Sequence, residues 1–359
     1  MPAMSTFRTI REVSQTRASA FAPLRSASVE VTVETDGSGG LDIRFGSPRH
    51  RPGILEQSAT ACLEETLARL PQDLRNALAV EAGEVRSLLG RDGAEVPLFS
   101  RAYRMASCRG VILGVRAAES PGPFDVPWTG TVAAGGIDPS LPVLLGPSAV
   151  LALVSFALEV TGSHVELRSR AEAPGLTVID TAGSPYPPQH HPFAEDGAPS
   201  PDRPLIEDGI WRNREEHAGD DVDPLFFLLT RPERALRPLA AATRFSRRNL
   251  SVRCGRTAPA PSPAILVDSW RVRVGPRGGA VPFHAELSVA GPDGERLAVT
   301  APVPLVLDPW EVLARVRGAC GPVAPGVDED PIEGDGYGEA PILATGLTLA
   351  DLTAPEAPR

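Results

Sequence analysis

One apolar stretch, residues 141–158, constrains the fold of this chain more than any other. Its sequence, LPVLLGPSAVLALVSFAL, contains no charged residue, so it must lie in a protein core or in a membrane. Gly146 and Pro147 interrupt it, because proline suits the first turn of a helix but not its interior. The helix that remains is too short to cross a bilayer. We therefore predict a buried strand before Gly146, a buried helix over residues 148–160, and no membrane span.

Two periodic segments near the N-terminus predict a small sheet with a covering helix. Residues 29–34 alternate apolar and polar side chains, a glycine-rich turn follows, and residues 41–45 alternate again, which is typical of a β-hairpin. Residues 54–70 place their apolar side chains on one helical stripe that Pro71 ends. Residues 108–117 indicate a further buried strand. Residues 1–25 are rich in Arg and Ser, and we expect them to be poorly ordered.

The second half of the chain has the pattern of a larger, strand-rich unit. Residues 264–307 predict an antiparallel meander, because short strands alternate with the turns GPRGG and GPDG. A helix is predicted from Asp308, its N-cap, to Cys320, and a final strand follows over residues 341–349. The fold class is therefore α+β. We expect a small domain over residues 26–116, a Pro/Gly-rich connection over 117–140, a β-rich domain over 141–359, and long loops over 182–224 and 321–340.

Composition excludes several classes of function. The net charge of −10 argues against a nucleic-acid partner. All 35 basic residues are arginine, so no Schiff-base lysine, pyridoxal-phosphate anchor or phosphate-loop lysine exists. The four cysteines lie far apart, which supports neither a zinc knuckle nor a disulfide scaffold and fits a reducing compartment. The first residues lack the apolar core of a secretory signal, so we expect a cytoplasmic protein.

Two loop features allow both functional and structural interpretations. His190 and His191 precede Glu195 and Asp196, and such residues can ligate a metal. Adjacent residues of an extended loop point in opposite directions, however, which favours exposed histidines over a shared ion. The turn at Gly146 is only superficially similar to a phosphate-binding loop, because it has one glycine and no lysine.

An arginine-rich segment, residues 231–256, is the third candidate site. It contains eight arginines against one acid, and planar guanidinium groups suit carboxylate or phosphate recognition. A solvated face, or an internal match to the acidic run EEHAGDDVD upstream, explains the pattern equally well. Arg244, Arg247 and Arg248 are its main candidates for contact with a substrate or a partner.

The order of features from about Leu141 to Leu352 resembles the TldD/PmbA family of modulators and metallopeptidases. The resemblance runs through PVLLGPSAVLALVSFALEV, then FAEDGAPSPDRPLIEDGIW, then RRNLSVRCG, and ends in a Cys-Gly-Pro followed by GYGEAPILATGLTL. The first 116 residues depart from the family pattern and are expected to be shortened.

The helix after Gly146 departs from the catalytic members of that family. They carry His-Glu-x-x-x-His there, which places two imidazoles one helical turn apart beside a general base. The corresponding positions here are Ser155, Phe156 and Val160, which supply no zinc ligand and no carboxylate. The family's metal-binding subunit also uses a cysteine near its end, where Cys320 lies, but a lone thiol does not restore the site.

The resemblance therefore points to the PmbA (TldE-like) subunit type, which holds no metal and no cofactor and pairs with a TldD-type peptidase that carries the zinc. Such pairs process peptides and, in some bacteria, small peptide-like natural products. Two alternatives stay open, namely an independent metal-free hydrolase or anion-binding enzyme, and a pure scaffold or binding protein. The irregular segments offer apolar side chains for a partner interface: Trp128, Tyr186, Phe193, Trp211 and Tyr337.

Overall fold

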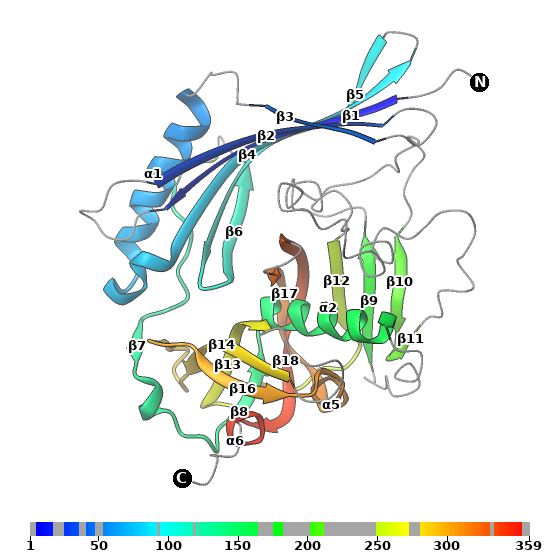
Figure 1. Cartoon of the computed structure of the whole chain (residues 1–359). Coiled ribbons are helices and arrows are strands. Elements are labelled where there is room, and N and C mark those ends of the chain that lie inside the picture. Colours follow the sequence, from blue (N-terminus) through cyan, green and yellow to red (C-terminus); the bar gives the residue numbers. More distant parts are fainter. Residues whose placement is uncertain are drawn as a thin grey trace.

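Figure 1 shows two β-sheets, each with a helix packed on one face, in a computed structural model of the chain. The structure describes residues 5–16, 25–35, 41–46, 53–91, 94–117, 120, 122–163, 175–181, 202–211, 249–272, 281–330 and 334–353. The architecture is α+β, as the sequence pattern predicts. Among the described residues, no helix combines the length and apolar character that a membrane span requires.

The N-terminal sheet has six antiparallel strands in the order β3-β2-β1-β4-β5-β6. The predicted hairpin is confirmed, because Val33 lies opposite Ile43 and Val31 lies opposite Phe45. The strands span β1 Ser5–Thr16, β2 Arg25–Thr35, β3 Leu41–Gly46, β4 Leu78–Arg91, β5 Ala94–Cys108 and β6 Val111–Ala117.

One strand of this sheet was not predicted, and another expectation is wrong. Residues 5–16 form β1 between β2 and β4, which both pair with it along its length. Residues 108–117 do not form one buried strand. They make a tight turn at Arg109-Gly110, where both residues have positive φ, and β6 is an edge strand in which only Ile112 is fully buried.

Helix α1, Gly53–Arg69, confirms the predicted stripe and covers one face of this sheet (Figure 1). The short helix η1, Gln72–Ala77, follows it and leads into β4. The apolar cluster beneath them contains α1 residues, β4 and β5 residues, and residues of the connection to the second sheet: Ala59, Cys62, Leu63, Leu67, Leu70, Leu74, Leu78, Val80, Ala82, Ala106, Cys108, Phe124, Trp128 and Ala298. This small core therefore reaches into the C-terminal unit.

The C-terminal sheet has the strand order β11-β10-β9-β12-β18-β8-β13-β14-β15-β7, with β16 paired to β14 and β17 paired to β18. Its strands span β7 Gly130–Val132, β8 Pro142–Leu145, β9 Leu176–Thr181, β10 Arg203–Glu207, β11 Ile210–Trp211, β12 Asn249–Cys254, β13 Ala264–Val272, β14 Val281–Ala290, β15 Arg296–Val299, β16 Val303–Leu307, β17 Val316–Asp330 and β18 Gly334–Thr348.

The antiparallel strands predicted over residues 264–307 are present, but their pairing differs from a simple meander. Strand β14 pairs with β13 along its length, while its two ends on the other side pair with different strands. Ser288 to Ala290 face β15, and Val281 to Ala285 face β16. The last two strands therefore share one edge of β14 instead of pairing with each other.

The end of the meander leads into a shorter helix than the sequence predicts. Asp308 caps α5, Pro309–Ala314, because its carboxylate accepts from the Trp310 and Glu311 amides. The chain is extended again from Val316. Within the segment 321–340, expected to be a loop, residues 321–330 lie in β17 and residues 334–340 lie in β18. A final short helix, α6 Leu349–Leu352, carries a capping box between Thr348 and Asp351.

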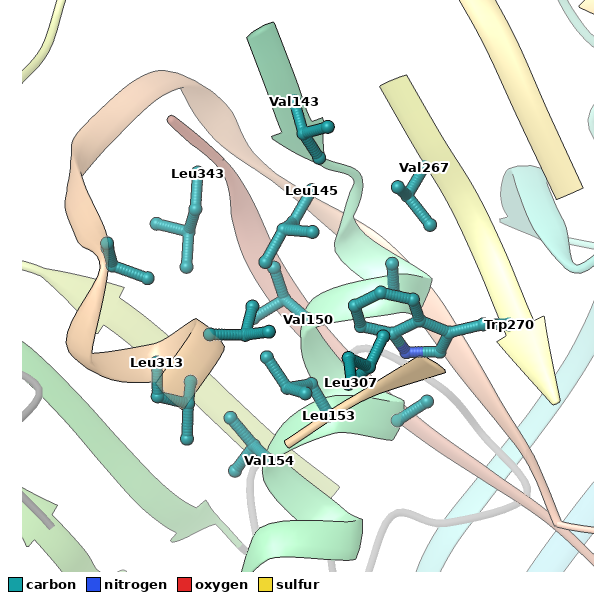
Figure 2. Close-up of a cluster of buried hydrophobic side chains, with 14 of the residues drawn as sticks. Val143, Leu145, Val150, Leu153, Val154, Val267, Trp270, Leu307, Leu313 and Leu343 are labelled. Carbon is teal, nitrogen blue, oxygen red and sulfur yellow. The ribbon is translucent and has the colours of Figure 1, made fainter. Parts of the chain in front are cut away.

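Helix α2, Pro147–Ser163, confirms the strand-turn-helix prediction and lies in the main core (Figures 1 and 2). Residues 148–154 are each at most 5% exposed. Figure 2 shows Val150, Leu153 and Val154 of α2 among side chains from the sheet and α5, including Trp270 and Leu313. Helix α2 is apolar on nearly all sides, which suits a helix that other elements cover on nearly all sides.

Three glycines let backbone segments approach α2 and its neighbours closely. A Cβ on Gly146 would lie 2.9 Å from the carbonyl oxygen of Val267, and one on Gly326 would lie 2.8 Å from the Ser148 nitrogen. A Cβ on Gly338 would lie 2.3 Å from the carbonyl oxygen of Leu250. No side chain fits at such distances from backbone atoms without moving a strand.

We predict that Gly338→Ala destabilises the chain by about 3 kcal/mol or prevents folding, because β12 must shift to admit the methyl group. Urea unfolding followed by circular dichroism measures the change. Gly135→Ala is the matched control, since a Cβ there meets nothing within 4 Å. Equal stability of the two variants would contradict the close approach of β12 and β18.

Candidate functional site

The first turn of α2 is closed by the β17–β18 hairpin. The Ser148 hydroxyl accepts a hydrogen bond from the Val327 amide at 3.0 Å, and Gly326 packs against the backbone of Pro147 and Ser148. A phosphate-binding turn needs open space before the first helical amides. The protein backbone fills that space, so the turn after β8 is a structural junction and not a phosphate site.

The middle of α2 contains the positions at which the resemblance expects catalytic residues. Ser155 and Phe156 are half-buried. The Phe156 ring meets Phe283 of β14 edge to face, with 5.7 Å between centroids and an interplanar angle of 84°. Phe283 in turn lies 5.5 Å from Trp270. Val160 belongs to the helix, but its side chain lies outside the described residues.

These side chains do not fit a zinc ion. An aromatic ring offers no donor atom, and a lone serine hydroxyl is not among the usual zinc ligands. The described residues contain no group of three or more His, Cys, Asp and Glu side chains that could hold a metal. The described face of α2 is built for apolar contact, because Phe156 packs into an aromatic pair where a general base would stand.

Cys320 has a different setting from the one the sequence predicts. It does not follow a helix C-terminus but lies within β17, where its thiol donates to the carbonyl oxygen of Ile342 at 3.5 Å. Burial raises the pKa of this thiol above its ordinary value. Burial also raises the pKa of Cys108, to about 12. Protonated thiols are poor nucleophiles and poor ligands, so these two residues act as small core side chains.

The remaining predicted contact residues cannot be placed. His190, His191, Glu195 and Asp196 lie outside the described residues, as do the arginines at positions 244, 247 and 248. Their assignment as substrate or partner contacts therefore stays a prediction, and so does the metal-binding alternative for the histidine pair.

The end of the arginine-rich segment is described, and it has an internal partner. Arg253 of β12 pairs with Glu339 of β18, with 2.6 Å between Nη2 and Oε1. Ser251 donates to the same carboxylate oxygen at 2.8 Å. The acid that matches Arg253 thus comes from the final hairpin and not from the acidic run upstream. Arg256 is exposed.

A buried polar network joins the segment that connects the two sheets to strands β13, β14 and β15 of the C-terminal sheet. Sequence reasoning missed this network. Asp268 is 1% exposed and lies at a bulge in β13, where its carboxylate accepts from the Ser288 hydroxyl and the Arg296 guanidinium. Trp128 donates from its indole nitrogen to Ser288 at 2.8 Å, and Arg296 lies over its ring. Trp128 is 3% exposed, so the expectation that it belongs to a partner interface is wrong.

A second polar contact joins the two sheets. Arg109, at the turn between β5 and β6, donates from Nε to Glu286 of β14 at 2.7 Å. The Ser269 hydroxyl donates to the Arg109 carbonyl oxygen at 2.8 Å. The Arg109 side chain is 6% exposed, so this ion pair is screened little by solvent. Together with Asp268, it fixes the N-terminal sheet against the meander.

Comparison with known proteins adds the family context. No protein-family model and no curated protein matches the chain. Among solved structures, TldE from Thermococcus kodakarensis aligns with a TM-score of 0.52 and 13% identity, over 96% of this chain and 95% of that chain. This chain has the TldE fold.

A second structure agrees with the first. A Thermotoga maritima protein, described as a candidate modulator of a DNA gyrase, aligns with a TM-score of 0.50 and 13% identity over 96% of this chain and 94% of that chain. The alignment with the TldE structure takes in most of the N-terminal part of this chain, although the sequence there departs from the family pattern. The expectation that this part is shortened stays a prediction.

We predict that Phe156→Glu destabilises the chain by about 3 kcal/mol, because it removes an aromatic contact and places a carboxylate beside Phe283. Phe156→Leu should cost about 1 kcal/mol and is the control. Urea unfolding of both variants, with zinc analysis after dialysis, makes the measurement. A Phe156→Glu variant with wild-type stability and bound zinc would show that the helix face is open.

Proposed function

We propose that this chain is a TldE-type subunit that completes the substrate cavity of a TldD-type zinc metallopeptidase without holding the metal. The fold it shares with the Thermococcus TldE over nearly the whole chain supports the family, and through it the kind of partner. In such a pair, the partner's zinc would polarise the amide carbonyl of the substrate and activate a water. This chain would position the peptide or peptide-like substrate.

The packing of Phe156 is the observation that carries the proposal. A catalytic helix must present its polar side chains to a cavity that substrate and water can enter. Here the position of the general base holds an aromatic ring packed against Phe283, and the preceding turns of the helix are buried. A polar side chain at this position would stand against that ring instead of facing water. The helix therefore supports the fold and does not supply chemistry.

The two other hypotheses differ in the residues that they require. An independent hydrolase would depend on Glu195, Asp196 and the histidines at 190 and 191, and a scaffold would need no chemistry at all. The experiment below separates these from the partner-subunit function.

Co-expression with a TldD-type subunit encoded beside this chain should give a stable complex that hydrolyses peptides, while neither chain does so alone. Size exclusion with light scattering measures the assembly, and amide hydrolysis of a peptide library measures activity. Zinc should follow the partner, so a partner with its zinc ligands replaced by Ala should give an inactive, zinc-free complex. If this chain alone hydrolyses peptides, the independent enzyme is correct. If the partner is fully active alone and no complex forms at micromolar concentration, the scaffold is correct.

Charge reversal of Arg247 and Arg248 to Glu should lower the activity of that complex at least about tenfold, since lost charge-assisted contacts to an anionic group are worth about 1.5–3 kcal/mol. The melting temperature of the isolated chain should not change. Arg317→Glu is the control, because Arg317 is exposed in β17 and lies outside the arginine-rich segment. Unchanged activity in both reversal variants would make the segment a solvated surface.

A further inference from the structure

Arg104 is a buried cation without a counter-charge in the described part of the chain. It lies in β5, and the residue is 4% exposed. Its Nε and Nη2 atoms have no hydrogen-bond partner, and it forms no ion pair with a described carboxylate. A buried charge left in this state is strongly unfavourable, and its unmet donors add to the cost. A group from outside the described part of the chain should therefore accept hydrogen bonds from Nε and Nη2 of Arg104.

A second arginine stands directly beside it. Arg116 of β6 is the register partner of Arg104, so both side chains leave the sheet on the same face. The Arg116 guanidinium lies over the Phe124 ring, 5.0 Å from its centroid, and also forms no ion pair among the described residues. Like charges placed opposite each other destabilise a strand pair. The two neighbouring cations thus strengthen the requirement for an anion.

Helix α1 covers the face of the sheet from which the two arginine side chains extend. Ala82, opposite Arg104 on β4, belongs to the apolar cluster beneath α1, so the arginines face the helix. Burial raises the pKa of the Cys62 thiol in α1, while its hydrogen bond with Thr66 and the positive charges of Arg104 and Arg116 lower it. Glu65 also acts on Cys62, but it is exposed and pairs with neither arginine.

We infer that Arg104 and Arg116 form a binding site for an oxyanion, a carboxylate or phosphate group, between α1 and the β5–β6 edge of the N-terminal sheet. Guanidinium forks match the geometry of both groups. Arg116 is half-buried and lies in the edge strand β6, so the anion would enter on the Arg116 side of the pair. The site shares no residue with α2, so it does not depend on the function proposed above.

The test is the thermal stability of the purified chain with different anions at constant ionic strength. Inorganic phosphate, or the dipeptide Ala-Ala with its free carboxylate, should raise the wild-type melting temperature by a few degrees, while chloride and the dipeptide amide should not. Whether phosphate or the dipeptide acts at lower concentration identifies the natural anion. Arg104→Met should not respond, and in chloride it should melt at or above the wild-type temperature, because an unpaired charge is removed.

Arg116→Met should bind the same anion at least about tenfold more weakly, and Arg317→Met should respond like the wild type. An equal response in the wild type and in Arg104→Met would mean an adventitious ion only. A second result would also overturn the inference. In it, no anion changes the melting temperature of the wild type, and both Arg104→Met and Glu84→Gln melt below the wild-type temperature. Glu84, two positions beyond Ala82 in β4, would then supply the counter-charge. If Arg104→Met does not fold, Arg104→Gln and Arg116→Met decide the question.

Discussion

The close approach of the β17–β18 hairpin to helix α2 is the contact on which the C-terminal unit depends. Gly326 and Gly338 place strand backbone where any side chain would collide with Ser148 or Leu250. Gly146 does the same for the turn that starts the helix. Protein interiors have the density of organic crystals, so a helix held at this spacing has one position and not several.

This tight placement explains why the helix is unsuited to carry a metal site. A zinc site in α2 would need two imidazoles, a carboxylate, second-layer partners and a route for substrate. Apolar side chains of β14, β16 and α5 occupy the main core in which the helix lies. The edge-to-face pair of Phe156 with Phe283 occupies the position at which the resemblance expects a general base. Restoring chemistry here requires repacking several elements at once, and single replacements of the three positions would not suffice.

Sequence patterns correctly predicted the elements whose structure is determined by residues close together in the chain. The hairpin of β2 and β3, helix α1 and the junction of β8 with α2 follow from periodicity and from Pro and Gly, which act within a few residues. Strand β1 was not predicted, because its sequence carries little apolar alternation and its pairing partners lie elsewhere in the chain. Helix α5 was predicted too long, since nothing in its sequence reveals that Val316 pairs with Thr345 of β18.

In the candidate site, too, features set by single residues could be predicted, and features set by contacts between distant segments could not. The prediction that Ser155 and Phe156 supply no zinc ligand rests on residue type alone. The Asp268 network was not predictable, because its members come from four separate segments and meet only after the bulge in β13 forms. Trp128 was misjudged for that reason, since a Pro/Gly-rich segment predicts exposure while a buried hydroxyl and a cation hold the indole inside.

The burial of Trp128 changes what a partner surface on this chain can be made of. Among the described residues, the large apolar side chains that are clearly exposed are Ile210 at 63% and Val323 at 39%, which do not make an apolar patch of useful size. A stable interface needs an apolar centre with a polar rim. Residues 182–201 and 212–248 contain Tyr186, Phe193 and the run PLFFLL beside most of the arginines. If the chain pairs with a peptidase, the apolar centre of the interface would have to come from outside the residues whose side chains the structure describes, and these two segments are candidates by composition.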